Sequence, residues 1–135
     1  MRDLRWSDVS EWLDPDHGAL HDGCVIGVVP GAWQAVADLV KARAWSAREG
    51  EGTLLVSPAE GFFVNFFEVP DEVVFDVHVG ELQGQQRLDL LSAFLRELGQ
   101  VWAKPVALAF EGLDPAQEPY LHYDPVADGF VLDRR

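Results

Sequence analysis

The sequence has little of three things: cysteine, positive charge and long apolar runs. Its one cysteine, Cys24, excludes a disulfide within the chain. The longest apolar runs, such as 62–67 and 106–110, fall far short of the roughly 20 residues that a membrane-spanning helix needs. Segment 1–13 carries charges where a secretory signal needs an apolar core. We therefore expect a cytoplasmic protein without a membrane segment.

Positive charge is scarce, because 10 Lys and Arg stand against 23 Asp and Glu, for a formal net charge of −13 at pH 7. Such a field repels phosphate backbones and anionic lipid headgroups and attracts basic proteins and cations. Nucleic acid is therefore not an expected partner. Some bacteria bias their whole proteome toward acids for solubility, and charge alone does not separate that explanation from a binding function.

Motifs for common catalytic chemistry are missing from the sequence. Neither GxGxxG nor GxxxxGK[ST] occurs, which argues against nucleotide phosphate binding. No GxSxG marks a serine nucleophile, and no HExxH marks a zinc site. We predict no catalytic residue and no cofactor.

What the chain does contain is enough apolar sequence for one domain over residues 1–135, with no repeat or linker that divides it. We expect a short helix that ends at Asp14-Pro15, a helix that begins at Pro30-Gly31, and a helix over 84–103. Apolar runs and alternation predict strands at 24–29, 53–57, 62–69, 72–79, 106–110, 120–123 and 130–133.

The order of these elements predicts an α+β fold. Short links between strands favour an antiparallel meander, and long amphipathic helices need a sheet to cover. We expect a two-layer sandwich with a mainly antiparallel sheet, two long helices on one face and a short N-terminal helix. A βαββαβ core with an extra strand would be a special case.

Acidic residues are dense near both ends of the chain, and if the ends meet they form one negative surface. Two tryptophans of the short N-terminal helix could serve there as aromatic anchors. The predicted binding set is Trp6, Trp12, Asp14, Asp16, Asp22, Asp124 and Asp128. The leading hypothesis is a non-enzymatic protein that engages a basic protein, as an inhibitor or toxin-neutralising factor would. Alternatively, the two tryptophans pack this helix onto the sheet.

A second hypothesis is a small enzyme or ligand-binding domain. His78 and Asp76 alternate on the polar face of one strand, and Asn65 interrupts the phenylalanines of 62–67. These three residues would polarise an apolar pocket between the sheet and the helices. A third hypothesis is a homodimer, formed through an exposed sheet edge or face, that has no catalytic activity.

The remaining histidines are weak candidates for metal ligands. His17 and His21 stand four apart, a spacing that would align them on a helix, but Pro15 and Gly18 disfavour a helix and no second ligand pair follows. We expect a polar loop there and no metal site. His122 is expected at the edge of a hairpin.

Overall fold

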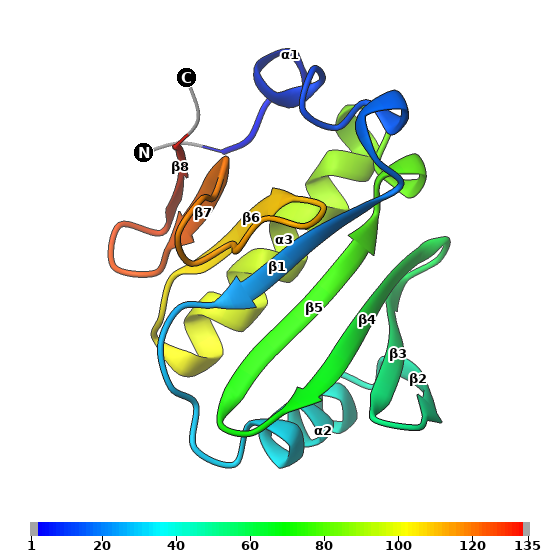
Figure 1. Cartoon of the computed structure of the whole chain (residues 1–135), viewed down its shortest axis with the longest axis vertical. Helices are drawn as coiled ribbons and strands as arrows, with labels where there is room; N and C mark the ends of the chain where they lie inside the picture. Colours follow the sequence, from blue (N-terminus) through cyan, green and yellow to red (C-terminus); the bar gives the residue numbers. More distant parts are fainter. Residues whose placement is uncertain (1–2, 134–135) are drawn as a thin grey trace.

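The computed structural model describes residues 3–133, and its centre is one antiparallel sheet of eight strands (Figure 1). The strands are β1 Leu20–Val25, β2 Ser46–Gly50, β3 Thr53–Ala59, β4 Phe62–Val69, β5 Glu72–His78, β6 Val106–Phe110, β7 Leu121–Asp124 and β8 Gly129–Leu132. Their order across the sheet is β2-β3-β4-β5-β1-β6-β7-β8, and every neighbouring pair is antiparallel. The predicted combination of helices with an antiparallel sheet is confirmed.

The helices are α1 Trp6–Val9, α2 Ala32–Ala42 and α3 Gln85–Trp102, with 3-10 turns at Pro15–His17 and Val79–Glu81. Figure 1 shows α3 behind the sheet and α2 behind its lower end. Because α3 has 18 residues and α2 has 11, the expectation of two long helices is met only in part. Within residues 3–133, no helix combines the length and apolarity that crossing a bilayer requires.

Strand β1 begins earlier than the sequence predicts, at Leu20 instead of Cys24. Residues expected in a polar loop therefore pair with β5 and β6 in the middle of the sheet. In this first part of β1 His21 is fully buried, and the lack of a side chain at Gly23 makes room for the Phe75 ring, which a Cβ there would approach to 2.4 Å. The strand ends at Val25 and not at Val29, because Gly27 turns the chain with a φ of 105°.

Strand β2 was not predicted. All five of its residues are exposed, and its sequence, SAREG, has no apolar alternation. It forms because a tight turn with Gly52 at a φ of 69° folds the chain back onto β3. Four strands therefore separate α2 from α3, instead of the two in a βαββαβ core.

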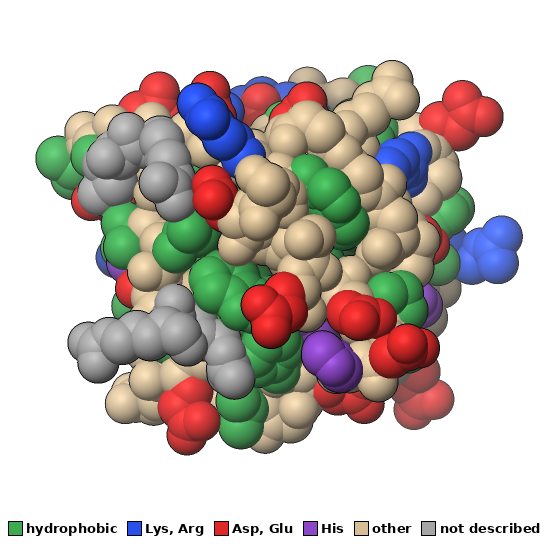
Figure 2. Space-filling view, turned by 90° about the horizontal axis from the view of Figure 1, so that it is seen from above, with side chains coloured by type: hydrophobic (Ala, Val, Ile, Leu, Met, Phe, Trp, Pro, Cys, Tyr) green, Lys and Arg blue, Asp and Glu red, His purple; other side chains and the backbone are tan. Residues whose placement is uncertain are grey.

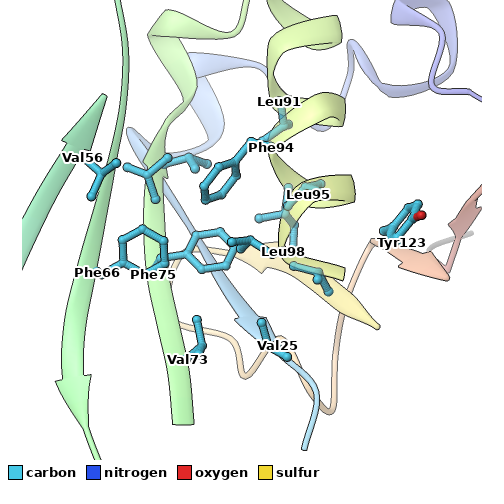
Figure 3. Packing of buried hydrophobic residues seen from close by; sticks show 14 of the residues in the cluster. Val25, Val56, Phe66, Val73, Phe75, Leu91, Phe94, Leu95, Leu98 and Tyr123 are labelled. Carbon is cyan, nitrogen blue, oxygen red and sulfur yellow. The ribbon is translucent and has the colours of Figure 1, made fainter. Parts of the chain in front are cut away.

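The main core lies between the sheet and α3 (Figure 3). Rings of Phe66 and Phe75 from the sheet meet Phe94 of α3, with ring centroids 6.1 and 5.4 Å from it. Leu95 and Leu98 of α3 are fully buried beside them. These side chains occupy the space between sheet and helix in which the second hypothesis placed a pocket.

Candidate functional site

The other face of the sheet, turned toward the viewer in Figure 1, carries no long helix, and we call it the open face. Cross-strand pairing places one residue from each of five strands in a single row on it. The row runs Arg48 (β2), Leu55 (β3), Asn65 (β4), Asp76 (β5) and Asp22 (β1). It brings together two residues of the predicted pocket and one of the predicted acidic binding set.

Asp22 and Asp76 are direct partners across β1 and β5. Side chains at such positions have Cβ atoms about 5 Å apart, and like charges there repel. Asp76 is only 8% exposed, and none of the described residues donates a hydrogen bond to its carboxylate. Burial raises the pKa of Asp76, and the charge of Asp22 raises it further. Asp76 is therefore a nearly buried acid that forms no ion pair with the residues that the structure describes.

Two further side chains, His78 and Glu111, affect the pKa of Asp76. His78, two residues after Asp76, is exposed at the end of β5 and opposes the rise in the Asp76 pKa. Glu111 acts in the opposite direction and adds to it. Two carboxylates, Asp22 and Glu111, therefore raise the Asp76 pKa, and the His78 imidazole opposes them.

A loop borders the acid pair on the β6 side. The backbone N–H of Gly112 donates to Oδ2 of Asp22 at 3.1 Å, and Pro115 in the same loop is buried. Ala107 and Ala109 of β6, which are on the open face, are fully buried. The loop over 111–119 therefore covers the β6 side of the open face, and the acid pair lies at the edge of the covered area.

On the other side the acid pair is bordered by apolar side chains. Phe67 and Val74 are paired residues in the next row and are partly exposed. Phe63, two residues before Asn65 on β4, is 38% exposed. Beyond them lies a hollow of about 390 Å³, lined by Ser46, Ala47, Arg48, Leu55, Ser57 and Phe63. The open face therefore combines an acidic centre with apolar surroundings.

Three other acids of the predicted binding set, Asp14, Asp124 and Asp128, serve the local fold. Asp14 accepts a hydrogen bond from the backbone N–H of Asp16, and Asp124 accepts two from the turn that follows it. Asp128 accepts from the Tyr123 hydroxyl and pairs with a guanidinium nitrogen of Arg96 at 2.8 Å. Their carboxylates are thus already partnered.

One cation links the N-terminal segment to the C-terminal hairpin. Arg96 of α3 binds Asp3 at 3.1 Å as well as Asp128, so it links the N-terminal segment to the β7–β8 turn. Figure 2, which looks down on the end that carries α1, shows Asp and Glu side chains spread over this end and several of them near a histidine. The surface is acidic, but Arg96 neutralises part of it.

Trp6 and Trp12 are partly buried and pack against the core. The Trp12 ring lies 5.4 Å from that of Tyr120, centroid to centroid. The backbone N–H of Trp6 donates to the Gln85 side chain at the start of α3. Both tryptophans thus attach the N-terminal segment to the rest of the fold.

The histidine region differs from the expected polar loop. His17 is exposed in its 3-10 turn, whereas His21 is fully buried in β1. The Nδ1 atom of His21 lies 2.8 Å from the Tyr120 hydroxyl oxygen, and its Nε2 has no partner within residues 3–133. Burial lowers the His21 pKa to about 4, so its imidazole is neutral at pH 7. His122 lies on the open face and its Nδ1 is 2.6 Å from Asp133.

Chemical reactivity at the open face is limited. Cys24 lies diagonal to Asp76, but burial, with the charges of Asp114 and Glu72, raises its pKa to about 11. A thiol with that pKa is protonated at neutral pH and is a poor nucleophile. Across the described part of the chain, His, Cys, Asp and Glu side chains form no group of three or more that could hold a metal ion.

The Asp22–Asp76 pair is the feature that sequence reasoning missed, although both residues were named. Asp22 was assigned to the terminal acids and Asp76 to a pocket, because β1 was expected to start after Asp22. An earlier start for β1 would have suggested a polar position within a central strand. Comparison with protein-family models, with curated proteins and with solved structures finds no match to this chain, so its candidate site is defined by the geometry of the open face.

Proposed function

We propose that this chain is a non-enzymatic cytoplasmic binding protein that engages a basic protein partner, of the inhibitor or toxin-neutralising type, through the open face. The observation that carries the proposal is the Asp22–Asp76 pair on that face. Asp76 is 8% exposed, accepts no hydrogen bond from the described residues and lies directly opposite Asp22, an arrangement that costs free energy in the isolated fold. Docking of a positive group would remove that cost.

The surroundings of the pair also suit a protein interface. Protein interfaces are enriched in aromatic residues relative to the rest of the surface. Phe63, Phe67 and Leu55 supply apolar contact area beside the acids, and the hollow at Phe63 offers a concave surface. A net charge of −13 adds long-range attraction for a basic partner and raises the association rate.

A second copy of this chain fits the open face less well. Stacking two open faces would bring two Asp22–Asp76 pairs toward each other and would join two molecules that each carry a charge of −13. A small enzyme would need a reactive group beside Asp76, and the nearby Cys24 thiol stays protonated. We therefore rank the basic protein above the homodimer and the enzyme.

Capture followed by quantitative binding tests the proposal. The immobilised protein is incubated with lysate of its source cells at low and at high salt, and a retained protein is identified, purified and titrated. Two variants with the same charge change are compared: Asn65→Arg, which places a bulky cation in the centre of the row, and Gln34→Arg, on the exposed side of α2. Gln34 hydrogen-bonds Asp38, and an arginine there keeps an acceptor.

We expect a basic partner that binds the wild type and the Gln34→Arg variant alike, and that dissociates as salt rises. The Asn65→Arg variant should bind at least about tenfold more weakly. Failure to retain any basic protein at low salt contradicts the proposal, as does a partner that the two variants bind equally well.

A further inference from the structure

We infer that the Asp22–Asp76 pair is a recognition site for one arginine side chain, whose guanidinium group lies across both carboxylates. The inference deepens the proposed function and rests on it, since the arginine would belong to the basic partner. It names the chemical group that the centre of the open face recognises.

The arrangement of the two carboxylates supports a guanidinium group. Asp22 and Asp76 are paired across β1 and β5, and residues at such positions have Cβ atoms about 5 Å apart. A guanidinium group has five N–H donors in a planar fork, which can reach two neighbouring carboxylates at once, whereas an ammonium group acts as a point charge. Gly112 occupies Oδ2 of Asp22, which leaves Oδ1 of Asp22 and both oxygens of Asp76 as acceptors.

Side chains next to the acid pair offer contacts for the aliphatic part of an arginine and for the plane of its guanidinium group. Phe67 and Val74 lie side by side in the next row, where the aliphatic stem of an arginine can pack. Phe63 and Phe67 flank Asn65 on β4, and an aromatic ring near the guanidinium plane adds cation–π attraction. The amide of Asn65 makes no hydrogen bond with the described residues, so its carbonyl oxygen is free to accept another N–H.

A metal ion fits the same place poorly. Calcium takes six to eight oxygen ligands. Two carboxylates and one amide provide too few, and among residues 3–133 there is no group of three His, Cys, Asp or Glu arranged for a metal. The aromatic rings that border the pair would exclude the water molecules needed to complete the ligand shell. An organic cation uses those rings as contact surface.

The test uses three blocked tripeptides that differ at one position: acetyl-Gly-Arg-Gly-amide, its citrulline analogue and its lysine analogue. Citrulline has nearly the shape of arginine but no charge. Each peptide is titrated into the full chain while ¹H–¹⁵N NMR spectra are recorded. We expect the arginine peptide to shift the backbone resonances of Asp22, Asn65 and Asp76, the lysine peptide to bind more weakly, and the citrulline peptide to have no effect.

Matched variants assign the binding to the acid pair. Asp76→Asn keeps the side-chain shape and should weaken the arginine peptide about tenfold or more, as loss of a charged hydrogen bond does. Asp38→Asn removes the same charge from α2 and should leave the binding unchanged. If Asp76→Asn does not fold, Asp22→Asn serves in its place.

Three results would overturn the inference. The arginine and citrulline peptides could have equal effects, the resonances of these residues could fail to shift, or the arginine peptide could bind the folded variant at position 76 or 22 as tightly as it binds the wild type. Calcium chloride is titrated separately, and shifts at the same residues would assign the pair to a metal instead.

The two proposals fail in different ways. If a basic protein binds the open face in the Asn65→Arg comparison but also binds Asp76→Asn with wild-type affinity, the proposed function stands and the arginine site is wrong. If the arginine peptide binds but no basic protein is retained, the arginine site stands and the proposed function is wrong.

Discussion

His21 is buried in β1 with a neutral imidazole, and its protonation must oppose folding. Its pKa falls from 6.5 to about 4 in the folded chain, mainly through burial, while Glu111 acts in the opposite direction. Because the unfolded chain takes up the proton first, stability is intact above pH 6.5 and is lost as the pH falls toward 4. Over this window the contribution amounts to about 3 kcal/mol.

Urea unfolding at pH 7, 5 and 4, followed by tryptophan fluorescence, measures this loss against the double variant His21→Phe with Tyr120→Phe. Removing both hydrogen-bonding partners leaves no orphaned polar atom at the site. We expect the variant to lose about 3 kcal/mol less than the wild type between pH 7 and pH 4. Parallel pH profiles for the two proteins would show that His21 is not the group that titrates.

Asp76 has the opposite linkage to pH. Its folded pKa is raised, so the folded chain holds the proton more tightly than the unfolded chain does. Stability therefore falls as the pH rises from the ordinary pKa of 3.8 through the raised one, and the full penalty applies at pH 7. We expect Asp76→Asn to raise the free energy of unfolding by about 0.5–1 kcal/mol at pH 7 and to have little effect at pH 3.

Asp38→Asn is the control for Asp76→Asn, because it changes the net charge equally at an exposed position of α2. It should alter stability by less than about 0.5 kcal/mol. A loss of stability in Asp76→Asn at pH 7 would mean that the carboxylate makes a stabilising contact. A higher free energy of unfolding would indicate that Asp76 destabilises the fold, as a residue that serves binding can do.

Helix α3 approaches β7 at Gly99, where the helix has no side chain. A Cβ there would lie 2.4 Å from the Tyr123 ring and 3.3 Å from the Lys104 carbonyl oxygen. Alanine favours a helix by about 1 kcal/mol over glycine, but this contact forces Tyr123 to move. Its hydroxyl donates to Asp128, so movement also disturbs the β7–β8 turn.

We expect Gly99→Ala to lower the free energy of unfolding by about 1–3 kcal/mol, as overpacking does. Gly80→Ala is the matched control, since nothing lies within 4 Å of a Cβ at that position. Denaturant unfolding of both variants measures the difference. A stabilised Gly99→Ala variant would mean that helix propensity outweighs the contact with β7.

Elements with strong apolar patterns were predictable from the sequence. The bounds of β4 and β6 agree with the prediction, and α3 differs from it by one residue at each end. Edge strand β2 was not predictable in this way, because an exposed strand needs no apolar side chains. The start of β1 was missed because His21 and Asp22 are polar, although one is buried by aromatic rings and the other belongs to the site.

The row across the open face was beyond sequence reasoning for a different reason. Asp22 and Asp76 are far apart in the chain, and a one-residue change of register would place one of them on the opposite face. Local pattern identifies which residues alternate along each strand. It does not identify which residues of two distant strands lie opposite each other, and the acid pair depends on that pairing.

At the scale of the molecule, a net charge of −13 destabilises the folded chain through self-repulsion. Few cations offset it: ion pairs between described side chains join Arg43 to Glu97, Arg96 to Asp3 and Asp128, and His122 to Asp133 when that imidazole is protonated. All of these partners are at least partly exposed, so each pair contributes little. Screening the repulsion should therefore outweigh weakening of the pairs.

Salt should thus stabilise the fold while it weakens binding to a basic partner. Raising NaCl from about 10 mM to about 300 mM shortens the screening length severalfold, and we expect the Tm at pH 7 to rise by about 3–5 °C, which corresponds to roughly 1 kcal/mol. Differential scanning calorimetry measures it, and KCl at equal concentration should act like NaCl if screening is the cause. A falling Tm would mean that the ion pairs dominate. If salt raises the Tm but weakens binding, the negative charge destabilises the isolated fold and also attracts the partner.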